Sequence, residues 1–437
     1  MLDIKFIREN LEEVKKAAKF KRKNVDFERL LDLDSKRREL QSKLEEIQAE
    51  KNELSKQSGK QKPSDEQIEK GKKLKESATE IENDLKGIEV ELKEILYNVP
   101  NVISSDTPEG KDDSENQVLR KFGEPKKFDF EPKDHVQLGE IHGLIDTEKS
   151  AMISGSRFNY LFGEAVMLQF ALIQFVFETL TDRKIIGELA KKVGNPSDKP
   201  FVPVLPPVIA KAEIMKKMDR FDPIEDRYYL EEDDSLLIGS AEHTLGPIHM
   251  DEVLNEKDLP IRYVGYSTAF RREAGSYGKD TVGILRRHQF DKLEMESFAT
   301  VENGLAEQNL IVAIQEYLVQ QLEIPHQVMA ICTGDIGKPD YRQIDIECWM
   351  PGQDKYRETH TSDYMTDFQA RRLNIRYNNE EGKKQFVHMN DATAFAIGRI
   401  LIAILENYQQ ADGSIAVPKV LKKYMPRGIE TIGEKKD

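Results

Sequence analysis

The first quarter of the chain alternates apolar and polar positions with a heptad period. Apolar residues recur in steps of three and four from Leu30 to Leu54 and again from Leu74 to Ile95. Between these runs, residues 58–65 (SGKQKPSD) contain a glycine and a proline, which break helices. The pattern predicts an antiparallel coiled-coil hairpin over about residues 28–97. A coiled coil formed with a second copy is the alternative, but the break followed by a return run favours the hairpin.

The remainder of the chain has the pattern of a globular domain. Residues 167–180 are apolar nearly all round and predict a buried helix, whereas the prolines of residues 200–209 (PFVPVLPPVI) predict an edge strand. Residues 343–349 alternate like a half-buried strand, and residues 391–405 pass from small residues into an apolar helix. Hairpin connections dominate over βαβ units, so we expect an α+β fold with an antiparallel sheet flanked by helices.

We therefore expect three parts: a helical arm (residues 1–98), a linker (99–120) and a globular domain (121–437). The linker prediction rests on residues 97–113, which contain Pro, Gly and acidic residues without periodicity.

Composition limits the class of protein. Hydrophobic residues make up 38% of the 437 positions, enough for a packed core, and no uninterrupted apolar run reaches membrane-spanning length. Cys332 and Cys348 show no CxxC spacing, which indicates a reducing compartment; we expect a cytoplasmic protein without a membrane partner. Residues 1–98 are electrically balanced, so the net charge of −14 lies in the remainder and the arm is the less acidic part. This is a weak indication of a polyanionic partner, and a solvated helix surface explains it equally well.

Residues 268–294 contain the highest density of candidate ligand-binding residues. Strand-forming residues on both sides predict a hairpin that returns Arg271 beside Phe290. A guanidinium binds phosphate with two parallel hydrogen bonds and an aromatic ring stacks on a base, so the pair favours a nucleotide site. A surface hairpin with solvated charges is the alternative. Residues 356–367 form a polar run, which a strand tolerates where it lines a wet cavity.

In this context the chain resembles the seryl-tRNA synthetases, a family of class II aminoacyl-tRNA synthetases. PFVPVLPPVI resembles class motif one, FRREAGSYGKDTVGILRRHQF motif two and AFAIGR motif three; CTGDIG, TDFQARRLNIRY and AILENYQQ are further family strings. The resemblance implies a class II sheet, a tRNA-binding arm and a homodimer. It also implies the activation of L-serine with ATP to seryl-adenylate and transfer to the 3′ end of tRNA(Ser), with tRNA(Sec) left open.

The resemblance also implies roles for individual residues. Arg271 would bind the α-phosphate, Phe290 and Arg399 would enclose adenine, Glu273 would bind the adenine amine, and Arg286 would bind the outer phosphates. The implied catalytic residues are Arg271, Glu273 and Arg399; the ATP-binding set is Arg271, Arg272, Glu273, Arg286, Phe290, Glu358, Thr359, His360, Thr361 and Arg399; the serine-binding set is Ser240, Ala241, Glu242, Arg271, Glu294, Asp391 and Thr393; and the Mg²⁺ ligands are Glu358 and Thr361.

Several positions depart from the family pattern. Ser240 replaces a threonine, Asp391 replaces an amide, and His360 and Asp363 lie where small hydroxylic residues are usual; residues 185–198 look like an insertion. We expect serine to remain the substrate. One alternative is a paralogue with altered amino-acid choice, in which the extra carboxylate of Asp391 favours a second ammonium group. Another is a non-catalytic RNA-binding protein, which the retained phosphate, base and metal residues argue against. Homologues that charge carrier proteins lack the arm.

Overall fold

The computed structural model describes residues 1–58, 64–274 and 283–433. Most of the turn predicted at residues 58–65, and the glycine-punctuated part of residues 268–294, lie outside the described residues. The chain divides into two compact units, Met1–Val102 and Ile103–Asp437. The division falls inside the segment expected as a linker, whose last residues belong to the first strand of the second unit.

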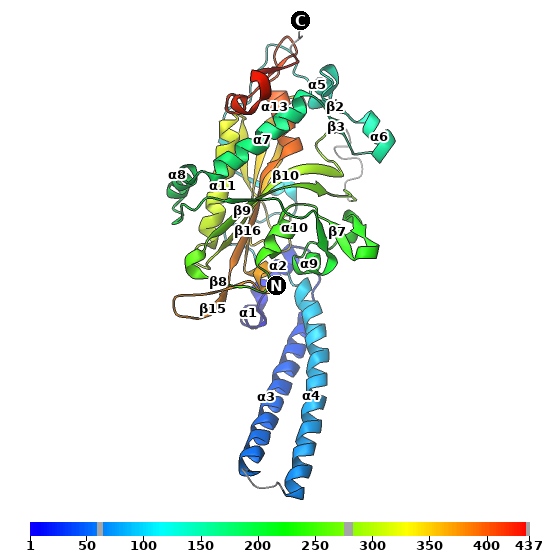
Figure 1. The fold of residues 1–437 in the computed structure, drawn as a ribbon, viewed down its shortest axis with the longest axis vertical. Helices are drawn as coiled ribbons and strands as arrows, with labels where there is room; N and C mark the ends of the chain where they lie inside the picture. Colours follow the sequence, from blue (N-terminus) through cyan, green and yellow to red (C-terminus); the bar gives the residue numbers. More distant parts are fainter. Residues whose placement is uncertain (59–63, 275–282, 434–437) are drawn as a thin grey trace. The chain divides into compact units, whose positions relative to one another are not determined.

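The described part of the N-terminal unit contains helices and no strand. Its helices are α1 (Ile4–Glu9), α2 (Leu11–Phe20), α3 (Phe27–Ser58) and α4 (Asp65–Asn98). The two long helices pack against each other through a buried seam that includes Leu44, Ala78 and Leu85 (Figure 1). A capping box of Ser64 and Gln67 starts α4 and satisfies backbone N–H groups that a helix leaves unpaired. The predicted hairpin within one chain is confirmed.

The second unit is built on an eight-stranded sheet. In spatial order its strands are β1 (Gln117–Phe122), β11 (His326–Ala330), β12 (Arg342–Met350), β13 (Lys355–Thr366), β16 (His388–Ala396), β10 (Gln289–Ala299), β9 (Ile261–Phe270) and β4 (Val202–Val204). Neighbours pair antiparallel except β4, which runs parallel to β9 at the edge. The α+β prediction is confirmed, and the proline-rich segment is the edge strand expected of it, because proline lacks the N–H that a central strand must donate.

Alternation along β10 separates the two faces of this sheet. Leu293 and Met295 belong to the main apolar core, together with residues of α7 (Glu164–Thr181), α11 (Gly304–Gln321) and α13 (Ile397–Asn407). Lys292 and Glu294 point to the opposite face, because successive side chains of a strand alternate. One face therefore packs a hydrophobic core, and the other is available for polar chemistry.

Helix α7 differs from the prediction of a helix buried all round. Leu168, Leu172 and Val176 are fully buried, but Phe170 is 57% exposed and Met167 is 42% exposed. The helix is also long and apolar enough to cross a membrane, with a mean hydropathy of 1.3, a test that core helices of soluble proteins pass as well. Its packing against α13 and α8 (Arg183–Val193) identifies it as a core helix with one uncovered strip. Helix α8 accounts for most of the expected insertion.

Smaller elements surround the main sheet. The remaining helices of the second unit are α5 (His135–Ile141), α6 (Glu148–Ser154), α9 (Ala212–Lys217), α10 (Glu242–Leu245) and α12 (Phe368–Leu373). The small sheets consist of β5 (Ile209–Lys211), β7 (Ser235–Leu237) and β6 (Tyr229–Leu230); of β15 (Lys384–Phe386), β14 (Arg376–Asn378) and β8 (Val253–Asn255); of β2 (Ile145–Asp146) and β3 (Tyr160–Leu161); and of β17 (Ile415–Ala416) and β18 (Thr431–Ile432).

Candidate active site

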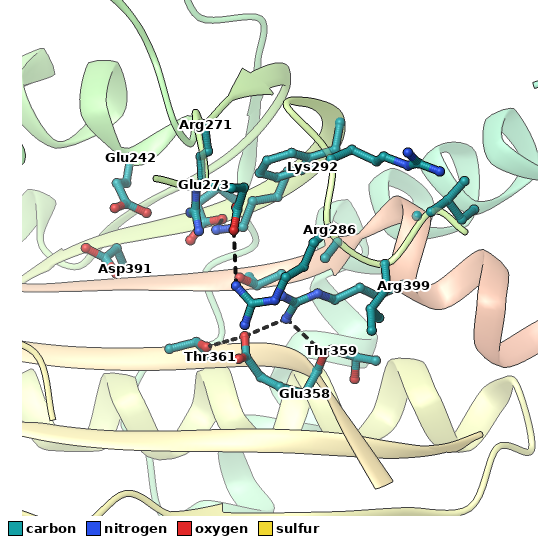
Figure 2. Close-up of a pocket in the computed structure, with 18 of the residues that line it drawn as sticks. Glu242, Arg271, Glu273, Arg286, Lys292, Glu358, Thr359, Thr361, Asp391 and Arg399 are labelled. Carbon is teal, nitrogen blue, oxygen red and sulfur yellow. Dashed lines mark hydrogen bonds and ion pairs between the residues drawn. The ribbon is translucent and has the colours of Figure 1, made fainter. Parts of the chain in front are cut away.

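A cavity of about 240 Å³ opens on the polar face of the sheet, bounded by the β9–β10 hairpin, β13, β16 and the start of α13 (Figure 2). It collects predicted residues from distant parts of the chain. The predicted site residues that line it are Glu242, Arg271, Glu273, Arg286, Phe290, Glu294, Glu358, Thr359, Thr361, Asp391, Thr393 and Arg399.

One end of the cavity combines a cation with an aromatic ring. The Arg271 backbone N–H donates to the carbonyl of His288 (3.0 Å), so the hairpin pairing continues past β9. As a result the Arg271 guanidinium carbon lies 5.5 Å from the Phe290 ring centroid, as the sequence predicted. Arg271 Nε donates to the carbonyl of Gly239 (3.0 Å), which fixes the direction of the guanidinium. A fixed cation beside an aromatic face suits a nucleotide.

Two further arginines enter the cavity beside carboxylates. Arg286 Nη1 donates to Glu273 Oε2 (3.1 Å), and Arg399 Nη1 donates to Glu358 Oε1 (2.8 Å). Enclosure in the cavity would raise the pKa of Glu358, but Arg399 outweighs this effect and lowers it, so the carboxylate is ionised. The Thr361 hydroxyl donates to the same Glu358 oxygen at 3.4 Å. Glu358 and Thr361 thus offer neighbouring oxygen ligands of the type that Mg²⁺ prefers.

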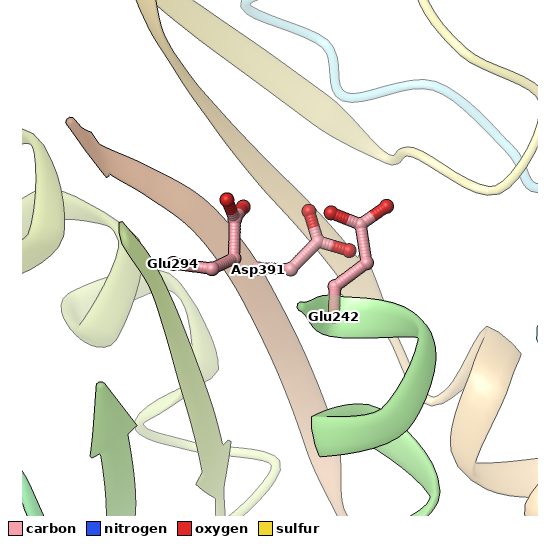
Figure 3. A group of neighbouring side chains, drawn as sticks. All are labelled: Glu242, Glu294 and Asp391. Carbon is pink, nitrogen blue, oxygen red and sulfur yellow. The ribbon is translucent and has the colours of Figure 1, made fainter. Parts of the chain in front are cut away.

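The other end of the cavity is lined by buried carboxylates. Oxygens of Glu242, Glu294 and Asp391 lie within 4.8 Å of one another (Figure 3). Lys292 Nζ lies 2.5 Å from Glu294 Oε2 and donates to Ser240 Oγ (3.0 Å). Arg220 Nε donates to Glu242 Oε1 (2.9 Å), and its Nη2 donates to Asp391 Oδ2 (3.3 Å). Two cationic side chains, Lys292 and Arg220, therefore contact the three carboxyl groups.

Burial and charge give these acids different protonation behaviour. Burial would raise the pKa of Glu242, but Arg220 and Lys292 outweigh it and hold that pKa well below its usual range. Burial raises the pKa of Glu294 to about 7, with the charge of Glu242 adding to the effect and Lys292 opposing it. Burial and the neighbouring charge of Glu242 also raise the pKa of Asp391. Among the three, Glu242 is the permanent anion, and Glu294 titrates near neutrality.

Four residues predicted for this site do not line the cavity. Arg272 is exposed, donates through Nε to the carbonyl of Arg227 (2.8 Å) and lies over the Tyr228 ring. His360 is fully buried on the opposite side of β13 against Phe395, and burial lowers its pKa to about 3, so the ring is neutral. Ser240 and Ala241 are fully buried behind the cavity wall. Ser240 is connected to the cavity through its hydrogen bonds with Lys292 and Glu294, both of which line it.

Two charged residues at this end were missed by the sequence reasoning. Lys292 could have been found, because it is two residues from both Phe290 and Glu294 in the predicted strand and therefore on the same face. Arg220 had no comparable signal. It lies in a connection after α9, far from the predicted motifs, and reaches the site only through the tertiary fold.

Comparisons with known proteins agree with this geometry. Residues 225–408 match a family model of the tRNA synthetase class II core domain (G, H, P, S and T), and residues 1–103 match that of the seryl-tRNA synthetase N-terminal domain. The chain is 40% identical over 443 residues to a serine–tRNA ligase of Dictyoglomus turgidum, with 100% of both chains covered. It is 41% identical over 442 residues to that of Treponema denticola, covering 99% of this chain and 100% of the relative.

Solved structures give the same assignment. The seryl-tRNA synthetase of Pyrococcus horikoshii complexed with ATP superposes with a TM-score of 0.86 at 36% identity, covering 99% of each chain. The cytoplasmic serine-tRNA ligase of Naegleria fowleri in complex with AMP superposes with a TM-score of 0.84 at 28% identity, and the match covers 99% of this chain and 98% of that one. Full-length similarity to relatives of this identity, together with matches to both family models, shows that the chain belongs to the seryl-tRNA synthetase family of class II aminoacyl-tRNA synthetases.

Proposed function

We propose that this protein activates L-serine with ATP and transfers the seryl group to the 3′ end of tRNA(Ser). The observation that carries the proposal is one cavity with two ends: a guanidinium beside an aromatic ring at one, and a small carboxylate-lined pocket at the other. The first end fits a nucleotide, and the second fits the ammonium and hydroxyl groups of a small amino acid.

In the first step, an oxygen of the serine carboxylate attacks the α-phosphorus of ATP and pyrophosphate leaves. The attacking group is already an anion, so the protein has to align the reactants and spread the phosphate charge. Arg271 would bind the α-phosphate, Arg286 the outer phosphates, and Phe290 and Arg399 the base. Glu273 would accept from the adenine amine. Arg272 lies outside the cavity, so geometry gives no support for its predicted contact with ATP.

Serine would be recognised by unsatisfied polar groups in a confined space. Glu294 and Thr393 line the cavity from facing positions of β10 and β16 and can bind the side-chain hydroxyl. Glu242, held as an anion by Arg220, can bind the ammonium group. Alanine lacks the hydroxyl group that would bond to Glu294 and Thr393, and hydrogen-bonding sites reject such analogues well.

A divalent cation fits the residues present. When bound, Mg²⁺ would neutralise phosphate charge, with Glu358 and Thr361 as its protein ligands.

The arm and the sheet edge suggest the macromolecular partners. The N-terminal unit matches the family's N-terminal domain, which supports tRNA binding by its helical hairpin. Exposed apolar side chains near the β4 edge, including Phe170, Val202 and Leu205, support a homodimer contact. The same family assignment supports a cytoplasmic location.

The alternative of a diamino acid substrate is not favoured by the comparisons. The structure gives a physical reason: Asp391 already has Arg220 as its cation, so a second substrate ammonium is not needed to neutralise it.

ATP–pyrophosphate exchange across a panel of small amino acids tests the proposal. We expect serine to give the highest kcat/KM, with alanine and glycine at least about 100-fold lower, since a missing partner for a buried polar group is costly. Deleting residues 28–97 should abolish tRNA charging and spare exchange. Preference for another amino acid would refute the choice of serine, and charging by the deleted protein would refute the role of the arm.

A further inference from the structure

Arg220 is delivered to the amino-acid pocket by an anchored turn. The chain leaves α9 and reverses at Asp219, whose φ of 60° is unusual for a residue with a side chain. The Asp219 carboxylate accepts from Lys338 Nζ (2.7 Å) and from Arg372 Nη1 (3.2 Å). These contacts hold the turn from two other segments of the chain, so the direction in which Arg220 points is built into the fold.

The guanidinium of Arg220 bridges two carboxylates that do line the cavity. It donates to Glu242 on α10 and to Asp391 on β16, and its own side chain is only 16% exposed. Arg220 does not itself line the cavity. It can therefore act on a substrate only through the two acids that it holds.

The bridge joins groups that would otherwise repel each other. Glu242, Glu294 and Asp391 approach within 4.8 Å, and Asp340 and Asp363 add negative charge around Arg220. Two like charges this close cannot both remain ionised without a counter-charge. Lys292 pairs with Glu294 and its charge also acts on Glu242, whereas Arg220 is the cation that donates hydrogen bonds to both Glu242 and Asp391.

We propose, resting on the serine activation proposed above, that Arg220 is a positioning residue that determines amino-acid specificity. By bridging Glu242 and Asp391, it aims an ionised Glu242 at the substrate ammonium. It also fixes Asp391 as the end wall of the pocket, so that the space beyond the substrate β-carbon admits a hydroxymethyl group and little more.

A purely structural bridge would behave differently. Its loss would lower stability and impair every substrate together, because the whole site would loosen. A positioning role instead predicts an effect confined to the amino acid, since within the described residues the side-chain hydrogen bonds of Arg220 go to Glu242 and Asp391, at the amino-acid end.

The test compares Arg220→Met, Arg220→Lys, Asp391→Asn and the double variant Arg220→Met/Asp391→Asn by pyrophosphate exchange. Arg183→Met serves as the control, because Arg183, the first residue of α8, forms an exposed ion pair with Asp198 in the segment after that helix. We expect Arg220→Met to raise KM for serine about 30-fold with KM for ATP unchanged within twofold. Relative activity toward threonine should rise. The double variant should recover about tenfold of the serine effect, because it removes the carboxyl group that faces Glu242 once Arg220 is gone, and the control should match the native protein.

The outcomes separate the two proposals. Equal increases in both KM values, an unchanged KM for serine, or no recovery in the double variant would overturn the role of Arg220. If Arg220→Met does not fold, Arg220→Lys decides: it keeps the charge but loses the two-pronged bridge, and should raise KM for serine about fivefold without affecting KM for ATP. If the native protein activates a different amino acid, the choice of serine fails and the same comparison of KM values judges Arg220 with that substrate. No exchange with any amino acid overturns both.

Discussion

Titration of Glu294 should control how the enzyme binds serine. Burial raises the pKa of this carboxyl from 4.5 to about 7, so its ionised form costs about 3 kcal/mol more in the folded protein than in water. The ionised form is the stronger acceptor for the serine hydroxyl. Because kcat/KM reports the free enzyme, kcat/KM for serine should fall about tenfold as the pH decreases from 8 to 6, following the ionised fraction of Glu294.

The variant Glu294→Gln isolates this effect. Glutamine keeps the shape and can still accept a hydrogen bond, but it does not titrate. At pH 8 we expect the variant to lose about tenfold in kcat/KM for serine, because a hydrogen bond to a charged acceptor contributes about 1–1.5 kcal/mol more than one to a neutral acceptor. Near pH 6 the carboxyl of the native protein is mostly protonated, so the ratio of native to variant kcat/KM for serine should decrease by about tenfold.

Pyrophosphate exchange at saturating ATP, measured from pH 5.5 to 8.5, provides the assay. The ratio of native to Glu294→Gln activity is the informative quantity, since titration of the ATP phosphates affects both proteins equally and cancels. A ratio that stays constant across this range would refute the reasoning, because it would mean that Glu294 does not change its charge while serine binds.

Three further perturbations probe stability, the base and the metal. Arg262→Met should destabilise the second unit by about 3–5 kcal/mol in a thermal melt, because the buried carboxylate of Glu307, 2.6 Å from Arg262 in the native protein, loses its cation. Adding Glu307→Leu should restore much of the lost stability. An unchanged Tm in the single variant would contradict the prediction. Phe290→Ala should raise KM for ATP about 5–100-fold by removing about 1–3 kcal/mol of stacking, with KM for serine nearly unchanged; an equal change in both would argue against stacking. Glu358→Gln should raise the Mg²⁺ concentration needed for half-maximal exchange about tenfold, and the same Mg²⁺ response as the native protein would remove Glu358 from the ligand set.

The pairing of Arg271 with Phe290 could be predicted from the sequence because strand geometry is local. Arg271 and Phe290 lie on adjacent strands of one hairpin, and alternation then decides which side chains share a face. The polar run of β13 was correctly associated with a cavity for a similar reason: several of its side chains line it, including Glu358 and Thr361.

His360 shows where local reasoning fails. Perfect alternation from Glu358 would place His360 on the cavity face. In the structure Glu347 opposes Glu358 while its neighbour Ile346 opposes His360, so Thr359 is an extra residue that shifts the pattern by one. This bulge turns Thr359 and Thr361 toward the cavity and His360 into the core. Nothing in the composition of the segment reveals where such an insertion occurs.

Arg220 illustrates a different limit, since its position depends on tertiary contacts between separate segments. The sequence did indicate Asp391 as an extra carboxylate and raised the question of its counter-charge. The counter-charge is Arg220, 171 positions earlier in the chain. It is held in place by a turn that Lys338 and Arg372 anchor. Charge balance predicts that a partner exists, but only the fold selects which one.

The density of buried charge at the amino-acid end argues for discrimination rather than stability. Burying ion pairs is often neutral or unfavourable compared with well-packed apolar residues, so Arg220, Lys292 and their acids do not strengthen the fold in proportion to their number. Their effect on ligands is asymmetric. An apolar side chain entering this pocket would strip water from charged groups without replacing its hydrogen bonds, whereas a hydroxymethyl group can restore them. In the function proposed above, a pocket walled by paired charges would therefore reject small apolar amino acids that size alone would admit, and any substitution that neutralises the wall should relax this rejection before it unfolds the protein.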